Sequence, residues 1–271
     1  MRAVGDRPVD TLVVTGGHPF EAEPFFAVFD SLDSITWTSA TEPGDGHDVV
    51  VFYDMPGLRF TRGDPPVEVV EPTPDQRAAI ARLCERGTGL VFLHHAVAGW
   101  PAWPAYAELV GGRFHYQPAT LCGTEYPDSG YRFDVEHTVE VLDPAHPVCA
   151  GLGPSFSLTD ELYCAPVFED RVVPLMRTSF PTGDPAQFFS ADQAIRGVRN
   201  RNDGWSHPPG SNLVAWAKAA GRSPVVYLQF GDGPVTYADP SYRRALANAI
   251  AWVASPDARE WAAARHEEVP R

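Results

Sequence analysis

A capped helix between two apolar segments is the feature that most constrains the fold of this chain. DVVVFYD (residues 48–54) and GLVFLHH (residues 89–95) are apolar runs, typical of strands buried on both faces. Between them, TPDQRAAIARLCERG (residues 73–87) begins with a Thr-Pro N-terminus and a capping box and ends at a glycine. This strand–helix–strand order predicts βαβ units and a parallel sheet.

The other periodic segments extend this pattern into one α/β domain over residues 11–255. Residues 11–20 and 35–40 are expected to form strands around a helix within residues 19–32. After about residue 130, short connections predict antiparallel or mixed additions to the same sheet. The expected additions are the strands 131–142, 172–179, 212–220 and 224–231, followed by an amphipathic helix over 241–254.

Three further segments flank or interrupt this domain. Residues 1–10 are expected to be an N-terminal extension, and residues 256–271 a C-terminal tail. Residues 181–211 are polar and rich in Gly and Pro, which predicts a long loop. Long loops in compact domains often serve as lids or binding loops, so this segment is a candidate part of a binding site.

Composition excludes several classes of partner. The formal net charge of -14 argues against nucleic acid and against anionic membrane surfaces. The N-terminus does not resemble a signal peptide, and the four cysteines show no CxxC spacing. We therefore expect a cytoplasmic protein with free thiols and a small-molecule ligand. The sequence leaves a homo-oligomer open.

Candidate site residues follow the expected parallel strands at their carboxyl ends, where α/β proteins bind ligands. These strand ends carry Gly17-His18, Tyr53-Asp54 and His94-His95. Histidine there can act as a base, an acid or a metal ligand. Adjacent strand residues point to opposite faces, so we expect one of the two adjacent histidines to face the cleft, and favour His95 because it lies at the turn.

The acids in LTDELY (residues 158–163) are the other candidates for chemistry. Asp160 and Glu161 can bind a metal, orient a histidine or transfer a proton. Equally, they can be first-turn acids at the start of a helix. The cofactor is unknown from the sequence. The histidines lack the close spacing of common metal motifs, and a divalent-metal site assembled from distant residues stays open.

Several segments, in order, resemble the ThuA-like (trehalose utilisation) family. They are GGH (16–18), GTGLVFLHHA (87–96), YAELVGGRF (106–114), HTVEVLDPAHPVCAGL (137–152), DELY (160–163) and NAIAWV (248–253). The resemblance implies a class I glutamine amidotransferase-like fold. That fold is a flavodoxin-like layered domain with a mostly parallel central sheet and antiparallel additions. This chain has no Cys or Ser at the turn after Leu93, so glutaminase chemistry is not expected.

The resemblance also implies a role in carbohydrate catabolism, acting on a 3-keto-glycoside or a related sugar derivative. A ketone at C3 acidifies the C2 proton, so a base can start elimination of the C1 substituent, and hydrolysis follows. The candidate catalytic residues are His95, His94, His18 and Glu161. The candidate substrate-binding residues are Gly17, Asp54, Tyr53, His115, Trp100, Asp160 and Asp232.

One departure from the family leaves a second function open. Asp232 in FGDGP stands where many relatives carry a histidine. Whether the chain is an enzyme, a lyase or hydrolase on modified glycosides, is therefore undecided. The alternative is a non-catalytic module that binds a carbohydrate or a partner on the same fold.

Overall fold

The apolar segments form one ten-stranded sheet within the part of the chain that the computed structural model describes, residues 7–61 and 63–265. One half of the sheet is parallel and the other is antiparallel. The parallel half contains, in spatial order, β2 (Ile35–Ala40), β1 (Val9–Gly16), β3 (Val49–Asp54), β6 (Gly89–Leu93) and β14 (Ser223–Leu228).

The antiparallel half continues from β14. It confirms the strands expected at 131–142, 172–179 and 212–220, and it adds a strand at 155–164 that the sequence did not predict. It contains β13 (Leu213–Ala220), β11 (Val173–Thr178), β9 (Gly130–Val141) and β10 (Ser155–Cys164), with β12 (Phe189–Ser190) also paired to β9. Two separate hairpins pair β4 (Leu58–Phe60) with β5 (Val67–Val69), and β7 (Ala119–Leu121) with β8 (Thr124–Tyr126). The predicted α/β class, a parallel sheet with antiparallel additions, is confirmed.

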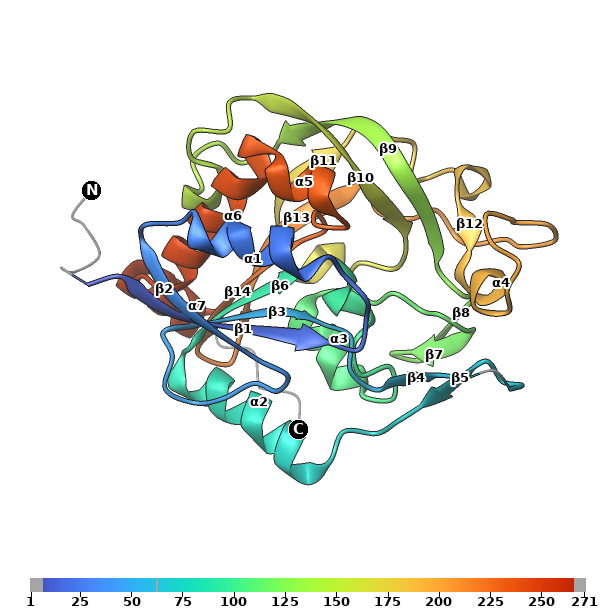
Figure 1. The fold of residues 1–271 in the computed structure, drawn as a ribbon, viewed down its shortest axis with the longest axis horizontal. Helices are drawn as coiled ribbons and strands as arrows, with labels where there is room; N and C mark the ends of the chain where they lie inside the picture. The colour runs from blue at the N-terminus through green and yellow to red at the C-terminus, as the bar shows by residue number, and fades with distance from the viewer. Residues whose placement is uncertain (1–6, 62, 266–271) are drawn as a thin grey trace.

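Helices cover both faces of the parallel strands (Figure 1). One face carries α1 (Ala22–Asp30), α5 (Pro234–Ala238), α6 (Pro240–Val253) and α7 (Pro256–Ala264). The other face carries α2 (Pro74–Arg86) and α3 (Pro104–Val110). The remaining short helices are α4 (Ala191–Ile195) and the 3-10 turns η1 (His94–Ala98), η2 (Pro147–Cys149), η3 (Glu169–Arg171) and η4 (Pro185–Gln187).

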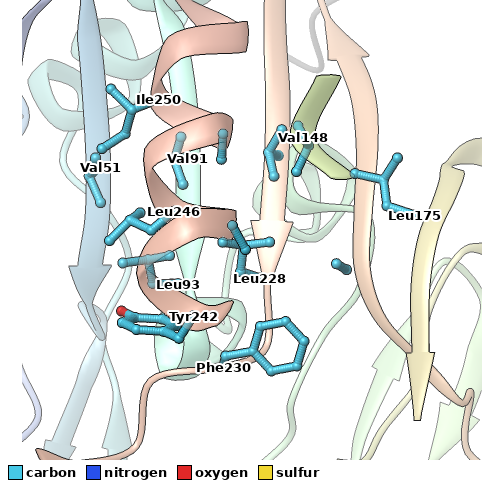
Figure 2. Packing of buried hydrophobic residues seen from close by; sticks show 14 of the residues in the cluster. Val51, Val91, Leu93, Val148, Leu175, Leu228, Phe230, Tyr242, Leu246 and Ile250 are labelled. Carbon is cyan, nitrogen blue, oxygen red and sulfur yellow. The ribbon is translucent and has the colours of Figure 1, made fainter. Parts of the chain in front are cut away.

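Alternation along each strand divides the apolar side chains between two cores. In β3, Val49 and Val51 pack in the core that contains α1 and α6, whereas Val50 and Phe52 pack in the core that contains α2 and α3. Figure 2 shows α6 lying over the parallel strands, with Leu246 and neighbouring apolar side chains directed toward them. A strand buried on both faces therefore needs the continuous apolar run seen in the sequence.

Helix α2 has the predicted caps. The Thr73 side chain accepts the backbone N–H of Gln76, and the Gln76 side chain accepts the backbone N–H of Thr73. Gly87 ends the helix in the left-handed conformation with φ 72°, which glycine adopts without steric cost. The four cysteines are free thiols, as predicted. None of the described helices is both long and apolar enough to cross a membrane.

The structure differs from the sequence-based expectation at four places. Residues 181–211, expected to be a long loop, contain η4, β12 and α4. Residues 158–163 lie in strand β10 and do not start a helix. The predicted tail contains α7, whose Ala258 and Ala262 are buried, because its apolar face packs on the sheet; its residues 266–271 lie outside the described part. At the other end, β1 begins at Val9, inside the expected extension, whose residues 1–6 are also outside it.

Leu246 tests this packing. Leu246 is fully buried between α6 and the sheet, so Leu246→Ala should lower the free energy of unfolding by about 2–5 kcal/mol, as cavity-forming substitutions do. The control is Val235→Ala, whose side chain is 70% exposed, and it should cost about 0.5 kcal/mol or less. Urea denaturation measures both variants. Equal losses would contradict the placement of α6 on the core.

Candidate functional site

A cavity of about 680 Å³ opens at the carboxyl end of the parallel strands. Its lining includes His18 after β1, His95 in η1, Glu161 in β10 and Asp232 after β14, each from a different segment, and also Arg199. The rest of the wall is mainly apolar. Its larger side chains are Phe60, Phe114, Tyr116, Tyr131, Phe133, Tyr163 and Ile195.

His95 lines this cavity, while His94 lies behind it. The backbone of His94 is left-handed, with φ 47°, so the chain turns sharply as β6 enters η1. The Nε2 atom of His95 lies 3.2 Å from the carbonyl oxygen of Tyr53, to which it donates as N–H. This bond leaves the lone pair on His95 Nδ1, which has no hydrogen-bond partner among the described residues.

A second imidazole lies beside His95. The ring centroids of His18 and His95 are 4.4 Å apart, and His18 Nδ1 also lacks a partner in the described part of the chain. Burial holds the pKa of His95 well below its ordinary value, and the neighbouring His18 adds to this effect. Burial likewise lowers the pKa of His18. Both rings are therefore neutral near pH 7.

His94 is buried behind the cavity and contacts two of the carboxylates that line it. Its Nδ1 lies 2.7 Å from the carbonyl oxygen of Gln229. Its Nε2 lies 2.8 Å from the Tyr163 hydroxyl, 3.1 Å from Glu161 Oε2 and 3.5 Å from Asp232 Oδ1. Burial alone would lower the pKa of His94, but the hydrogen bonds to Asp232 and Glu161 outweigh it and raise that pKa well above its ordinary value.

Asp160 holds the loop that carries Asp232. Its carboxylate accepts the backbone N–H of Gly231 at 2.7 Å, of Asp232 at 3.0 Å and of Glu161 at 2.9 Å. The pairing of β10 with β9 shifts register between Asp160 and Leu162, an irregularity of the kind that re-aims side chains. Asp160 therefore fixes the backbone that carries Asp232 and Glu161, and the Glu161 side chain lines the cavity.

Five other candidate residues do not line this cavity. Asp54 and Trp100 line a separate pocket of about 60 Å³. Tyr53 extends its hydroxyl into the core, 2.7 Å from both the Gly231 carbonyl oxygen and the Tyr237 hydroxyl. His115 is buried and stacks on Tyr126.

The fifth of these residues is Gly17, which has a packing role. A Cβ atom there would lie 2.3 Å from the backbone oxygen of Met55, and the residue has φ 77°. Only glycine fits such a close backbone approach in the left-handed region. Gly17 thus lets the backbone after β1 pack directly against Met55, the residue after β3. This close packing positions the next residue, His18.

The apolar wall is the part of the site that sequence reasoning missed. Phe60 comes from β4, Phe133 from β9 and Ile195 from α4, and no motif marks any of them. Two weak signals existed. The polar 181–211 segment is a candidate binding loop from its sequence, and its Ala191, Ala194 and Arg199 do line the cavity. Tyr116, an aromatic near the GGRF segment, lines it too.

Comparisons with known proteins agree with this architecture. The sequence matches the ThuA family, described as trehalose utilisation, over residues 45–253. The chain belongs to this family. No curated protein matches the sequence significantly.

Solved structures of ThuA-like proteins share the fold. One from Parabacteroides merdae ATCC 43184 superposes with a TM-score of 0.66 at 13% identity, covering 92% of this chain and 91% of the other. Another, from Bacteroides uniformis ATCC 8492, gives 0.61 at 19% identity, with 92% of each chain covered. A cytoplasmic protein of Salmonella typhimurium gives 0.53 at 11%, covering 90% and 98%.

The buried Asp54 generates a prediction about pH and stability. Burial raises the pKa of Asp54 to about 7, whereas an unfolded aspartate titrates near pH 4. Between these values the unfolded chain releases its proton while the folded chain keeps it, so the free energy of unfolding falls as pH rises. Asp54→Asn should not show this loss. From pH 5 to pH 8 its free energy of unfolding should therefore rise by about 2–3 kcal/mol relative to that of the wild type.

Urea denaturation at the two pH values measures this difference. Asp33→Asn, at an exposed aspartate, is the control and should follow the wild type at both. Parallel behaviour of Asp54→Asn and the wild type would show that Asp54 is ionised in the folded protein at pH 5.

Proposed function

We propose that this protein acts on a sugar derivative, such as a 3-keto-glycoside, with His95 as the base that starts an elimination. The observation that carries the proposal is the tautomer of His95. Its Nε2–H donates to the Tyr53 carbonyl oxygen, so the unpartnered Nδ1 lone pair belongs to a ring that lines the cavity. A positioned imidazole that is unprotonated near neutral pH has its lone pair available to accept a proton.

The proposed reaction uses the acidity that a C3 ketone gives to C2. His95 Nδ1 takes the C2 proton, and the electron pair moves into the C2–C3 bond to form an enolate at the C3 oxygen. The carbonyl re-forms, a C1–C2 double bond appears, and the C1–O bond breaks. The departing oxygen receives the proton from His95, and water then adds to the double bond to give the free keto sugar.

His18 supports this chemistry as a second neutral imidazole. Its ring is 4.4 Å from that of His95 and lines the same cavity. A neutral histidine can donate a hydrogen bond to a developing enolate oxygen. The pair therefore offers one group for the proton and one for the charge.

The apolar wall supports a substrate with an apolar part. Phe60 and Phe133 are 45% and 46% exposed, and both line the cavity. Exposed aromatic side chains at a pocket favour stacking on a sugar ring or an aromatic aglycone. In this proposal the modified sugar lies near His95 and its substituent lies toward these aromatics, in a cytoplasmic protein whose thiols stay reduced.

One observation favours the alternative, a module that binds carbohydrate without catalysis. The family resemblance places a histidine where this chain has Asp232, whose Oδ1 lies 3.5 Å from His94 Nε2. An aspartate there keeps a polar contact but supplies no imidazole. Turnover therefore has to be separated from binding.

His95→Ala tests the base. The variant should lower kcat on a 3-keto-glucoside by about 100- to 10,000-fold, because a positioned base contributes about that much. The matched control is His137→Ala, since His137 is also buried but bonds Thr178 Oγ1 in the antiparallel half, 2.9 Å away. Circular dichroism should show both variants folded.

Two outcomes would contradict this function. Wild-type turnover that survives His95→Ala would show that another group is the base. Binding of the keto sugar by calorimetry, with no turnover by the wild type, would establish the binding module instead. Parent glycosides without the ketone should be unreactive in either case.

A further inference from the structure

We propose that His94, Glu161 and Asp232 form a binding site for one divalent transition-metal ion, such as Zn²⁺, at the inner end of the cavity. The three side chains come from η1, from β10 and from the loop after β14. One ligand atom from each lies within 4.8 Å of the others. This inference does not depend on the sugar chemistry proposed above.

The spacing of the ligand atoms suits one ion. Nitrogen and oxygen ligands lie about 2.0–2.2 Å from Zn²⁺, which places tetrahedral ligands about 3.3–3.6 Å apart. His94 Nε2 is 3.1 Å from Glu161 Oε2 and 3.5 Å from Asp232 Oδ1. Small side-chain movements therefore suffice to bind the ion.

The surrounding contacts orient the ligands as in known metal sites. The Nδ1–H of His94 donates to the Gln229 carbonyl oxygen at 2.7 Å, so Nε2 is the atom that would bind the metal, which would replace the proton on it. Asp160 accepts the backbone N–H of Asp232 and of Glu161, which fixes both carboxylate-bearing residues. In known metal sites, the histidine ligand typically donates its other ring N–H to a carbonyl or carboxylate oxygen, and the carboxylate ligands are held by hydrogen bonds as well.

An independent feature points to a further ligand in the same cavity. His95 is 3% exposed and lines the cavity, and its Nδ1 has no partner within the described residues.

Three protein ligands leave a tetrahedral ion one open position, which water or a substrate oxygen fills in catalytic sites. Glu161 and Asp232 both line the cavity, so that position is reached from it.

The donor set indicates which ions the site would take. One imidazole and two carboxylates suit Zn²⁺ or another first-row divalent ion, and the absence of a thiolate among them disfavours soft ions. Mg²⁺ prefers an all-oxygen, octahedral and largely hydrated environment, so it should bind more weakly. The ion would offset the two carboxylate charges. As a Lewis acid it would polarise a carbonyl oxygen at the open position.

Direct metal binding tests the proposal without any assay of turnover. The full-length protein, treated with a chelator and dialysed, should bind one Zn²⁺ per chain in isothermal titration calorimetry, and Mg²⁺ more weakly. Asp232→Asn should weaken Zn²⁺ binding by at least about 100-fold, since even partners of metal ligands contribute about 10–100-fold. Glu161→Gln should do the same.

Asp54→Asn is the matched control, because Asp54 is a buried carboxylate that lines a different pocket. It should bind Zn²⁺ like the wild type. Circular dichroism of the metal-free variants shows whether each is folded, and Asp232 is the safer position because its side chain is 34% exposed. The proposal is overturned if the wild type binds no Zn²⁺, or if folded Asp232→Asn binds it equally well.

Discussion

The carboxylate of Asp160 connects the two halves of the structure, and the site depends on that connection. It lies in β10, at the outer edge of the antiparallel half, and accepts the backbone N–H groups of Gly231 and Asp232 in the loop after β14. A buried carboxylate needs such hydrogen-bond partners. Without them its burial costs several kcal/mol of folding free energy, or the carboxylate takes up a proton and becomes neutral. The bonds therefore hold β10 across the end of the parallel strands.

This arrangement divides the site between the two halves. The parallel half supplies the imidazoles, with His18 after β1 and His94 and His95 after β6. The antiparallel half supplies Glu161 and aromatic residues of the wall, of which Tyr163 bonds His94 Nε2 at 2.8 Å. The cavity is therefore lined from both halves, by polar and by apolar side chains. The antiparallel strands thus complete a ligand site that begins at the usual edge of a parallel sheet.

Local signals account for what the sequence predicted correctly. The capped helix at residues 73–87 and the apolar strands around it carry their structure in neighbouring residues, so β1, β2, β3 and β6 followed from pattern alone. The parallel pairing of β14 with β6 did not, because residues 224–231 were expected among the antiparallel or mixed additions. The strand ends at His18 and His95 followed for the same reason. Asp160 and Glu161 were ambiguous because adjacent acids suit a helix start, and only pairing with β9, 25 or so residues away, makes the segment a strand.

Long-range packing decides the rest, and a single sequence does not encode it visibly. Asp54 is the last residue of β3 and His95 lies just after β6, yet Asp54 lines a different pocket from His18 and His95. Phe60, Phe133 and Ile195 meet only after the chain folds, and each alone looks like an ordinary apolar residue. The positive φ of His94 goes with the turn that directs its ring toward Glu161 and Asp232. No glycine beside it in the sequence indicates that turn.

The central claim is that a sugar derivative lies in this cavity with its reacting carbon beside His95. A crystal structure of the folded His95→Ala variant with a 3-keto-glucoside tests it most directly. The account predicts that the keto sugar lies at the polar end, with C2 facing the space left by the imidazole and the C1 substituent toward Phe60 and Phe133. A sugar bound elsewhere on the protein, or turned with its substituent toward residue 95, would contradict the account.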